Sequence, residues 1–356
     1  MLDYLIEDFD TEFLKPLKAD QQAITGCLRT ELQNLADTSH LEKNVVSEPL
    51  FEWDYRAIDD GFLHLMEPFM RSESHIPLLF CSILRDLGCA PEKYLKASLL
   101  LEYSYYAIGV IDYFNFHDVF TKSEQNLLKY SELTQVRYAA QYLIQYPRYL
   151  VIQNAFNLDH TANIELHKLY ANVGVTTGIG RGVFIKWANK HFKEVSKEYY
   201  FQNNINVLNN FFIFPAVLAG IIAGVDPVNM ERLKKAFSAL TLVAKLRLER
   251  KLYQDQTLPA VDEMFRDLNL LVTFPGVALI QGELKIDSSL FQDMKYPSIT
   301  KMYTQLCDSM TNSSMEKSIA TIEDMEHQCF QIFLEEIEKT GLLADTLVRI
   351  RNSFSM

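Results

Sequence analysis

Apolar residues recur at spacings of three and four along most of this chain, which is the period of one face of an α-helix. The strict alternation that is typical of a half-buried strand is rare, and residues 275–287 are the only weak candidate for one. The clearest helical segments are residues 77–88, 94–114, 136–152, 229–253 and 319–339. The pattern therefore predicts an all-α fold.

Glycine and proline mark where these helices end and begin. Gly88, Gly224 and Gly341 each follow a helical segment, where glycine tolerates the left-handed backbone that closes a helix. Pro91 and Pro227 stand at the next helix starts, where the missing N–H of proline costs nothing. We therefore expect breaks at these positions and long helices between them.

The segment from Tyr94 to Ile111 is apolar nearly all round, so it has to be surrounded by other helices. Such a helix predicts a large antiparallel bundle. The sequence contains no internal repeat and no linker rich in Gly, Ser or Pro, so we predict a single domain over residues 1–356.

Charge and cysteine usage narrow the function classes. A net charge of −12 argues against a nucleic-acid partner, because phosphate binding needs a basic surface. The five cysteines form no C-x-x-C pair, which favours free thiols in a reducing compartment. The acidic start of the chain lacks the basic region of an export signal, so we expect a cytoplasmic protein. The apolar run 211–225 is too short for a membrane span and contains Pro215, so we expect a buried core helix there.

The order of segments resembles the trans-isoprenyl diphosphate synthases, the polyprenyl synthetase branch of the isoprenoid synthase superfamily. Residues 76–118 are similar to the helix pair that leads into the first aspartate-rich motif of that family, and residues 217–246 to the pair before the second. Residues 293–303 are similar to a late Tyr-Pro helix start. The resemblance covers roughly residues 60–340 and rests on helix order.

The resemblance implies a helical bundle around a central apolar cavity that holds a prenyl chain. It also implies Mg²⁺ ions that stabilise the charge of a diphosphate leaving group, basic residues that clamp the diphosphates, and a dimer through the central helices. A prenyl diphosphate or another long apolar molecule is then the expected ligand, and a homodimer or a heterodimer with a related synthase the expected assembly.

The first motif of the family, D-D-x-x-x-x-D, appears here as Asp112 to Asp118 with Tyr113 in place of the middle carboxylate. Asp112 and Asp118 are therefore the candidate Mg²⁺ ligands. The alternative is that they are polar residues at a helix end, with no metal at all.

The second motif, Q-x-x-D-D-x-x-D, falls on residues 245–252, where Glu249 is the one carboxylate among Lys245, Arg247, Arg250 and Lys251. Cations repel Mg²⁺, so a metal is not expected here. Lys245 is a candidate for binding an anion in place of a metal; the alternative, which the run of charges favours, is a solvated basic face of a helix.

The basic clamps of the family are also missing. The early G-G-K-R-x-R-P motif falls on residues 71–77, where only Pro77 is in register, and the Lys-Thr pair expected near residues 207–210 is absent. Arg181, in the glycine-rich run 176–182, is a candidate anion ligand at a helix kink. The other interpretation of these glycines is close helix packing.

The resemblance also assigns the depth of the cavity. Ala107 and Ile108 occupy the positions that limit prenyl chain length, and both are small enough for a long chain. Phe114, inside the first motif, is the aromatic candidate for contact with the chain, against the alternative of core packing.

Three functions remain open. The leading hypothesis is a divergent protein that accommodates a prenyl or other apolar chain without ordinary chain elongation, as a non-catalytic partner subunit or a repurposed pocket in isoprenoid or specialised metabolism. The second is an active Mg²⁺-dependent prenyltransferase or terpene-synthase-like enzyme that uses Asp112 and Asp118. The third is a structural homodimeric interaction protein.

Overall fold

The computed structural model describes residues 75–90, 150–186, 196–209, 212–254 and 312–353, with the single positions 93, 97, 100, 101, 145, 147 and 148. Contacts divide the chain into two compact units: residues 9–158, and residues 159–356 together with residues 1–8. Each unit is described by itself, and the single-domain interpretation stays a prediction. The described parts of both are helical, with no strand among them, so the predicted all-α class is confirmed.

The unit of residues 9–158 contains α6, His75–Asp86. Phe80, Ile83 and Leu84 are fully buried on one face of α6. The helix ends as predicted at Gly88, whose φ of +75° lets its N–H reach the carbonyl of Arg85 while the N–H of Cys89 reaches that of Leu84. In the predicted all-round apolar segment, the described residues Ala97, Leu100 and Leu101 are fully buried.

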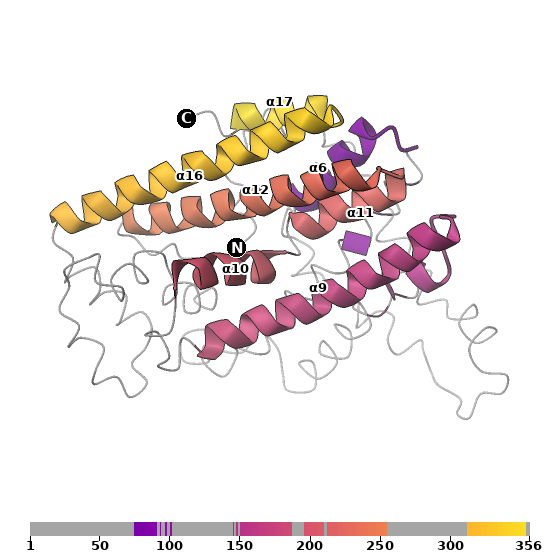
Figure 1. Ribbon diagram of the computed structural model, residues 1–356, viewed down its shortest axis with the longest axis horizontal. Coiled ribbons are helices and arrows are strands. Elements are labelled where there is room, and N and C mark those ends of the chain that lie inside the picture. Colours follow the sequence, from indigo (N-terminus) through magenta and orange to yellow (C-terminus); the bar gives the residue numbers. More distant parts are fainter. Residues whose placement is uncertain are drawn as a thin grey trace, which may run out of the picture. The chain divides into compact units, whose positions relative to one another are not determined.

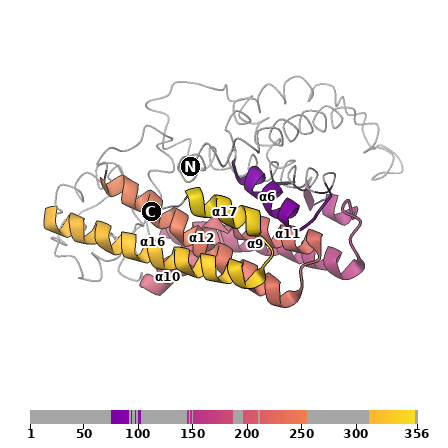
Figure 2. The same ribbon diagram turned by 90° about the horizontal axis from the view of Figure 1, so that it is seen from above.

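The unit of residues 159–356 is a set of helices packed along one another. In Figures 1 and 2 the two longest, α12 and α16, lie side by side, and α9 contacts both α10 and α11. The helices are α9 (His160–Lys186), α10 (Lys197–Leu208), α11 (Ile213–Ala223), α12 (Pro227–Gln254), α16 (Asn312–Thr340) and α17 (Ala344–Ser353).

The junction between α11 and α12 follows directly from its sequence. Gly224, at φ +71°, closes α11 by donating its N–H to Ile221, and the N–H of Val225 reaches the carbonyl of Gly220. Asp226 then begins α12, because its carboxylate accepts the N–H groups of Val228 and Asn229. These bonds stabilise the ionised form and lower the pKa of Asp226. The predicted break and the predicted proline start are both confirmed.

The most apolar run of the chain is a core helix, as expected. Eight residues of α11, from Phe214 to Gly220 and then Ile222, are buried. No single helix in the described ranges is long and apolar enough to cross a membrane, although one bent pair, Glu198–Leu208 with Ile213–Ala223, passes by length and composition. The burial of α11 inside this unit accounts for its composition.

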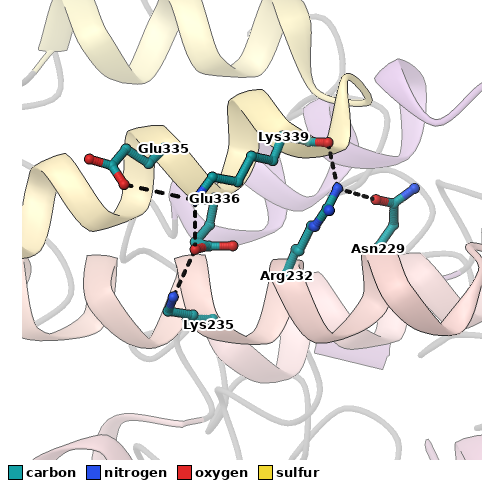
Figure 3. A network of polar contacts seen from close by, with 6 residues as sticks. All are labelled: Asn229, Arg232, Lys235, Glu335, Glu336 and Lys339. Atoms are coloured by element: carbon teal, nitrogen blue, oxygen red, sulfur yellow. Dashed lines mark hydrogen bonds and ion pairs between the residues drawn. The ribbon is translucent and has the colours of Figure 1, made fainter.

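Antiparallel packing of α12 and α16 combines apolar and ionic contacts. Phe237 and Phe333 meet edge to face, with ring centroids 5.8 Å apart. Figure 3 shows the ionic contacts beside them: Lys235 and Lys339 lie 2.7 and 3.2 Å from the carboxylate of Glu336, and both lower its pKa, Lys235 more strongly. Arg232 donates to the backbone carbonyl of Lys339 at 2.7 Å, which caps the end of α16.

Candidate functional site

The segment that resembles the second aspartate-rich motif lies near the end of α12. Residues 245–252 belong to this one continuous helix, and α12 is packed against both α10 and α16. One face of this segment therefore meets α10 and another meets α16. Some of its charged side chains lie on the first face and others on the second.

Lys245, Glu249 and Tyr200 form one buried group, which we call the buried charge cluster. The ammonium of Lys245 lies 3.1 Å from the carboxylate of Glu249, and their side chains are 3% and 0% exposed. The hydroxyl of Tyr200, on α10, donates a hydrogen bond to the same carboxylate oxygen. Tyr200 is itself fully buried.

Local geometry brings the cluster together. Residues four apart on a helix lie on one face, so Lys245 and Glu249 meet without any help from the tertiary fold. The surroundings are apolar: Tyr200 packs with Leu246 of α12 and Ile322 of α16, both fully buried. Burial of a charge is costly unless the charge is paired, and here each charge is the partner of the other.

This arrangement does not fit Mg²⁺. The ion needs several oxygen ligands, mostly carboxylates and waters in octahedral geometry. The single carboxylate here, Glu249, already faces an ammonium and a phenol, and the ammonium would repel a second cation. No group of three His, Cys, Asp or Glu residues that could hold a metal occurs within the described ranges.

Other basic residues of the segment pair with α16. The guanidinium of Arg247 lies 2.8 Å from Glu326, which is 1% exposed. Arg250 lies 3.2 Å from the other oxygen of Glu326, a distance within ion-pair range but without hydrogen-bond geometry, and 3.3 Å from Glu323. The interpretation of this segment as a solvated basic face was therefore wrong for Lys245, which is buried, and incomplete for Arg247 and Arg250.

Of the remaining predicted site residues, Arg181 lies in α9, which runs unbroken from His160 to Lys186. Its side chain is not among those described. The candidate metal ligands Asp112 and Asp118, and the candidate chain contacts Ala107, Ile108 and Phe114, lie outside the described residues. Their roles stay predictions.

Close helix packing explains one of the glycines in the run 176–182. A Cβ at Gly180 would lie 2.7 Å from Cγ2 and 3.2 Å from the backbone nitrogen of Val207 in α10. The side chain of Asn203, also from α10, donates to the carbonyl of Gly180 at 3.1 Å. The packing interpretation of the glycine-rich run is confirmed at this position.

Two residues that matter here carried no signal in the sequence. Tyr200 meets Glu249 from 49 positions away, and Glu326 meets Arg247 from 79 positions away. Neither lies in a recognisable motif. The one available clue was physical: a basic run on a mostly apolar helix needs acidic partners if the helix is buried.

Buried polar atoms also occur between α9 and its neighbours. The hydroxyl of Tyr170 has no hydrogen-bond partner, and burial raises its pKa. The ring of Tyr170 meets Phe214 of α11 edge to face, with centroids 5.1 Å apart. The amide oxygen of Asn209, at the end of α10, is likewise buried without a partner. Such atoms normally bind water or a polar group of a ligand.

No protein-family model matches this sequence, and no curated protein matches it. Solved structures do match. A polyprenyl synthetase from Streptomyces coelicolor A3(2) superposes with a TM-score of 0.68 at 12% identity, over 93% of this chain and 95% of that chain. A decaprenyl diphosphate synthase from Rhodobacter capsulatus superposes with a TM-score of 0.61 at 14% identity, over 96% of this chain and 99% of that chain. The T. brucei farnesyl diphosphate synthase superposes with a TM-score of 0.62 at 10% identity, over 93% of this chain and 97% of that chain.

At these identities the likeness concerns the fold and not the chemistry. It extends over nearly the whole of each chain, so it is not confined to one shared helix pair. The resemblance first seen in the order of segments is thereby confirmed at the level of structure. The chain has the isoprenoid synthase fold of the prenyl diphosphate synthases.

Proposed function

We propose that this chain is a non-catalytic protein of the isoprenoid synthase fold that accommodates a prenyl or other extended apolar chain and does not elongate it. The observation that carries the proposal is the buried charge cluster. Where the resemblance places carboxylates for Mg²⁺, α12 has an ammonium and a carboxylate that neutralise each other. A site of this kind has no carboxylate left for metal-assisted ionisation of a diphosphate.

The sequence supports the same conclusion independently of the cluster. Elongation joins two diphosphate substrates, and each needs cations to hold it. The early basic motif and the mid-chain Lys-Thr pair are both missing. Loss of the metal ligands on α12 together with the clamps removes the means of binding the second substrate, while the helical frame stays.

A fold that is kept while the metal ligands and basic motifs are missing supports a role as a partner subunit. A chain that keeps the fold but lacks the reaction is useful through what it binds, either an apolar molecule or another protein. The neighbours named above are prenyl synthases, and we propose a prenyl chain as the ligand because the resemblance implies a bundle around a central apolar cavity. From the cysteine usage we further propose that the protein acts in the cytoplasm.

Calorimetric titration distinguishes the three functions. Geranylgeranyl diphosphate and geranylgeraniol are each titrated into wild type and Asp112→Ala, with and without Mg²⁺. We expect both ligands to bind with affinities within about tenfold of each other, because the apolar chain supplies most of the binding energy. Neither the metal nor the substitution is expected to change this.

Two other outcomes would overturn the proposal. Binding of the diphosphate that requires Mg²⁺ and is lost in Asp112→Ala would instead establish a working metal site and the enzyme function. Absence of binding by either ligand would leave the structural interaction protein. Incubation with isopentenyl diphosphate in the same buffers checks elongation directly, and no longer product is expected.

A further inference from the structure

Helix α9 contacts both α10 and α11, and two side chains of α9 lie on either side of the break between those helices (Figure 1). Thr176 accepts a hydrogen bond from the amide of Asn209, at the end of α10, at 3.4 Å. The ring of Tyr170 meets Phe214 of α11, and the N–H of Phe214 donates to the backbone carbonyl of Asn209 at 2.8 Å. Tyr170 and Asn209 therefore both border Phe214, where α10 ends and α11 begins.

The hydroxyl of Tyr170 and the amide oxygen of Asn209 are both buried and have no partner within the protein. The orientation of the amide follows from Thr176, whose hydroxyl donates to the carbonyl of Asn172 at 2.9 Å. Thr176 can then only accept from Asn209, so the amide nitrogen faces Thr176 and the oxygen is left over. Burial raises the pKa of Tyr170, so its hydroxyl keeps a proton to donate. One group that donates and one that accepts together match a hydroxyl, which does both.

The chain around these two atoms carries no charge. Residues 169–180 of α9 contain no Asp, Glu, Lys or Arg, and neither do residues 199–225, which include most of α10 and all of α11. A buried diphosphate or carboxylate needs a cation as its partner, and these stretches supply none. A buried hydroxyl needs only hydrogen bonds, and two are on offer. The site therefore suits an uncharged polar group.

We propose that Tyr170 and Asn209 bind the hydroxyl group of a long apolar alcohol. This inference rests on the proposed function and names its ligand as an isoprenoid alcohol rather than an isoprenoid diphosphate. The buried charge cluster lies at the opposite end of α10, because Tyr200 precedes Asn209 by about 13 Å of helix. The hydroxyl of the alcohol therefore lies away from residues 245–252, the segment where the resemblance places the diphosphate.

The test removes one hydroxyl from the protein and compares two ligands. Geranylgeraniol and geranylgeranyl diphosphate are each titrated calorimetrically into the full chain as wild type, Tyr170→Phe and Tyr199→Phe. We expect Tyr170→Phe to weaken geranylgeraniol about fivefold through the lost hydrogen bond. The diphosphate should bind as before, because its charged end does not enter this site. Tyr199, on α10 and 47% exposed, is the matched control, and Tyr199→Phe should change the binding of neither ligand.

Thermal unfolding without ligand separates a binding role of Tyr170 from a structural one. Tyr170→Phe keeps the ring contact with Phe214 and breaks no hydrogen bond within the protein, so its melting temperature should equal or exceed that of wild type. A clearly lower melting temperature would show that water already holds the hydroxyl as part of the fold, and would overturn the proposal.

The two ligands also separate this inference from the function on which it rests. If both bind wild type and Tyr170→Phe weakens neither, or weakens both equally, the hydroxyl site is wrong while the proposed function stands. If neither ligand binds wild type, the proposed function fails and the hydroxyl site fails with it.

Discussion

Lys245 and Glu249 are opposite charges that the protein holds out of water on successive turns of α12. Each charge stabilises the other, since an unpaired buried charge costs far more than a lost surface contact. The hydroxyl of Tyr200 donates a hydrogen bond to the carboxylate of Glu249. The energetic role of the pair is therefore best measured by removing one member and then both.

Glu249→Gln should lower the free energy of unfolding by about 3–5 kcal/mol, because it removes the negative charge that lies 3.1 Å from the buried Lys245 ammonium. The double variant Lys245→Met/Glu249→Gln should lose less than the sum of the two single changes. Urea denaturation gives all of these values. Glu231→Gln is the matched control, since Glu231 pairs with Lys234 on the same helix but is 73% exposed, and its loss should cost at most about 1 kcal/mol. Equal effects at Glu249 and Glu231 would contradict the buried pairing.

At the scale of helices, the close contact of α9 with α10 depends on the absence of a side chain at Gly180. Gly180→Ala should destabilise the fold by about 1–3 kcal/mol, because the new Cβ meets the backbone of Val207 as well as its side chain. Gly178→Ala, two residues away with nothing within 4 Å, should gain about 0.5–1 kcal/mol from helix propensity. The measurement is thermal unfolding. If both substitutions shift the melting temperature in the same direction, the close approach of Gly180 to Val207 is refuted.

The start of α12 predicts a pH-dependent contribution. Hydrogen bonds from Asn229 and Val228 lower the pKa of Asp226 below 3.8, so the capping contribution is present above the unfolded-state pKa and is lost as pH falls through the folded-state pKa. Asp226→Ala should therefore lower the melting temperature by a few degrees near pH 6, and this difference from wild type should narrow as the pH falls below the ordinary range of an Asp pKa.

Asp226→Asn serves as the control for this cap. Asparagine caps a helix without titrating, so the gap between Asp226→Asn and Asp226→Ala should persist into acid. If the difference in melting temperature between wild type and Asp226→Ala does not change with pH, the carboxylate is not the capping group in solution.

Helix ends were predictable from sequence because their causes are local. Gly224 and Asp226 close and open neighbouring helices through bonds within five residues, and the sequence shows the residue types that such bonds need. The state of Lys245 was not predictable in the same way. A run of basic residues is usually solvated, and only the packing of α10 and α16 around α12 turns this run into buried and paired charges.

At the scale of the whole molecule, the fold of the prenyl diphosphate synthases is kept while most residues of the family's motifs are replaced. Packing an apolar face requires only residues of suitable size and polarity, so a fold is kept at 10–14% identity to the structures compared. A diphosphate site requires particular charges at particular places. The sequence therefore predicted the fold well, and predicted at the second motif which ligands were missing but not the ion pair that replaces them.

Because the losses are distributed over the chain, restoring one motif should not restore the reaction. The variant Lys245→Gln/Leu248→Asp/Glu249→Asp/Leu252→Asp recreates the second motif on α12, and adding Tyr113→Asp completes the first. With Mg²⁺, an allylic diphosphate and labelled isopentenyl diphosphate, we expect no product above that of heat-denatured protein from either variant. The carboxylates can hold Mg²⁺ against one diphosphate, but residues 71–77 and 207–210 still lack the cations for the second substrate. Product from the first folded variant, with helicity checked by circular dichroism, would show that α12 alone had silenced an otherwise complete enzyme, and product from the second alone would show that both motifs had.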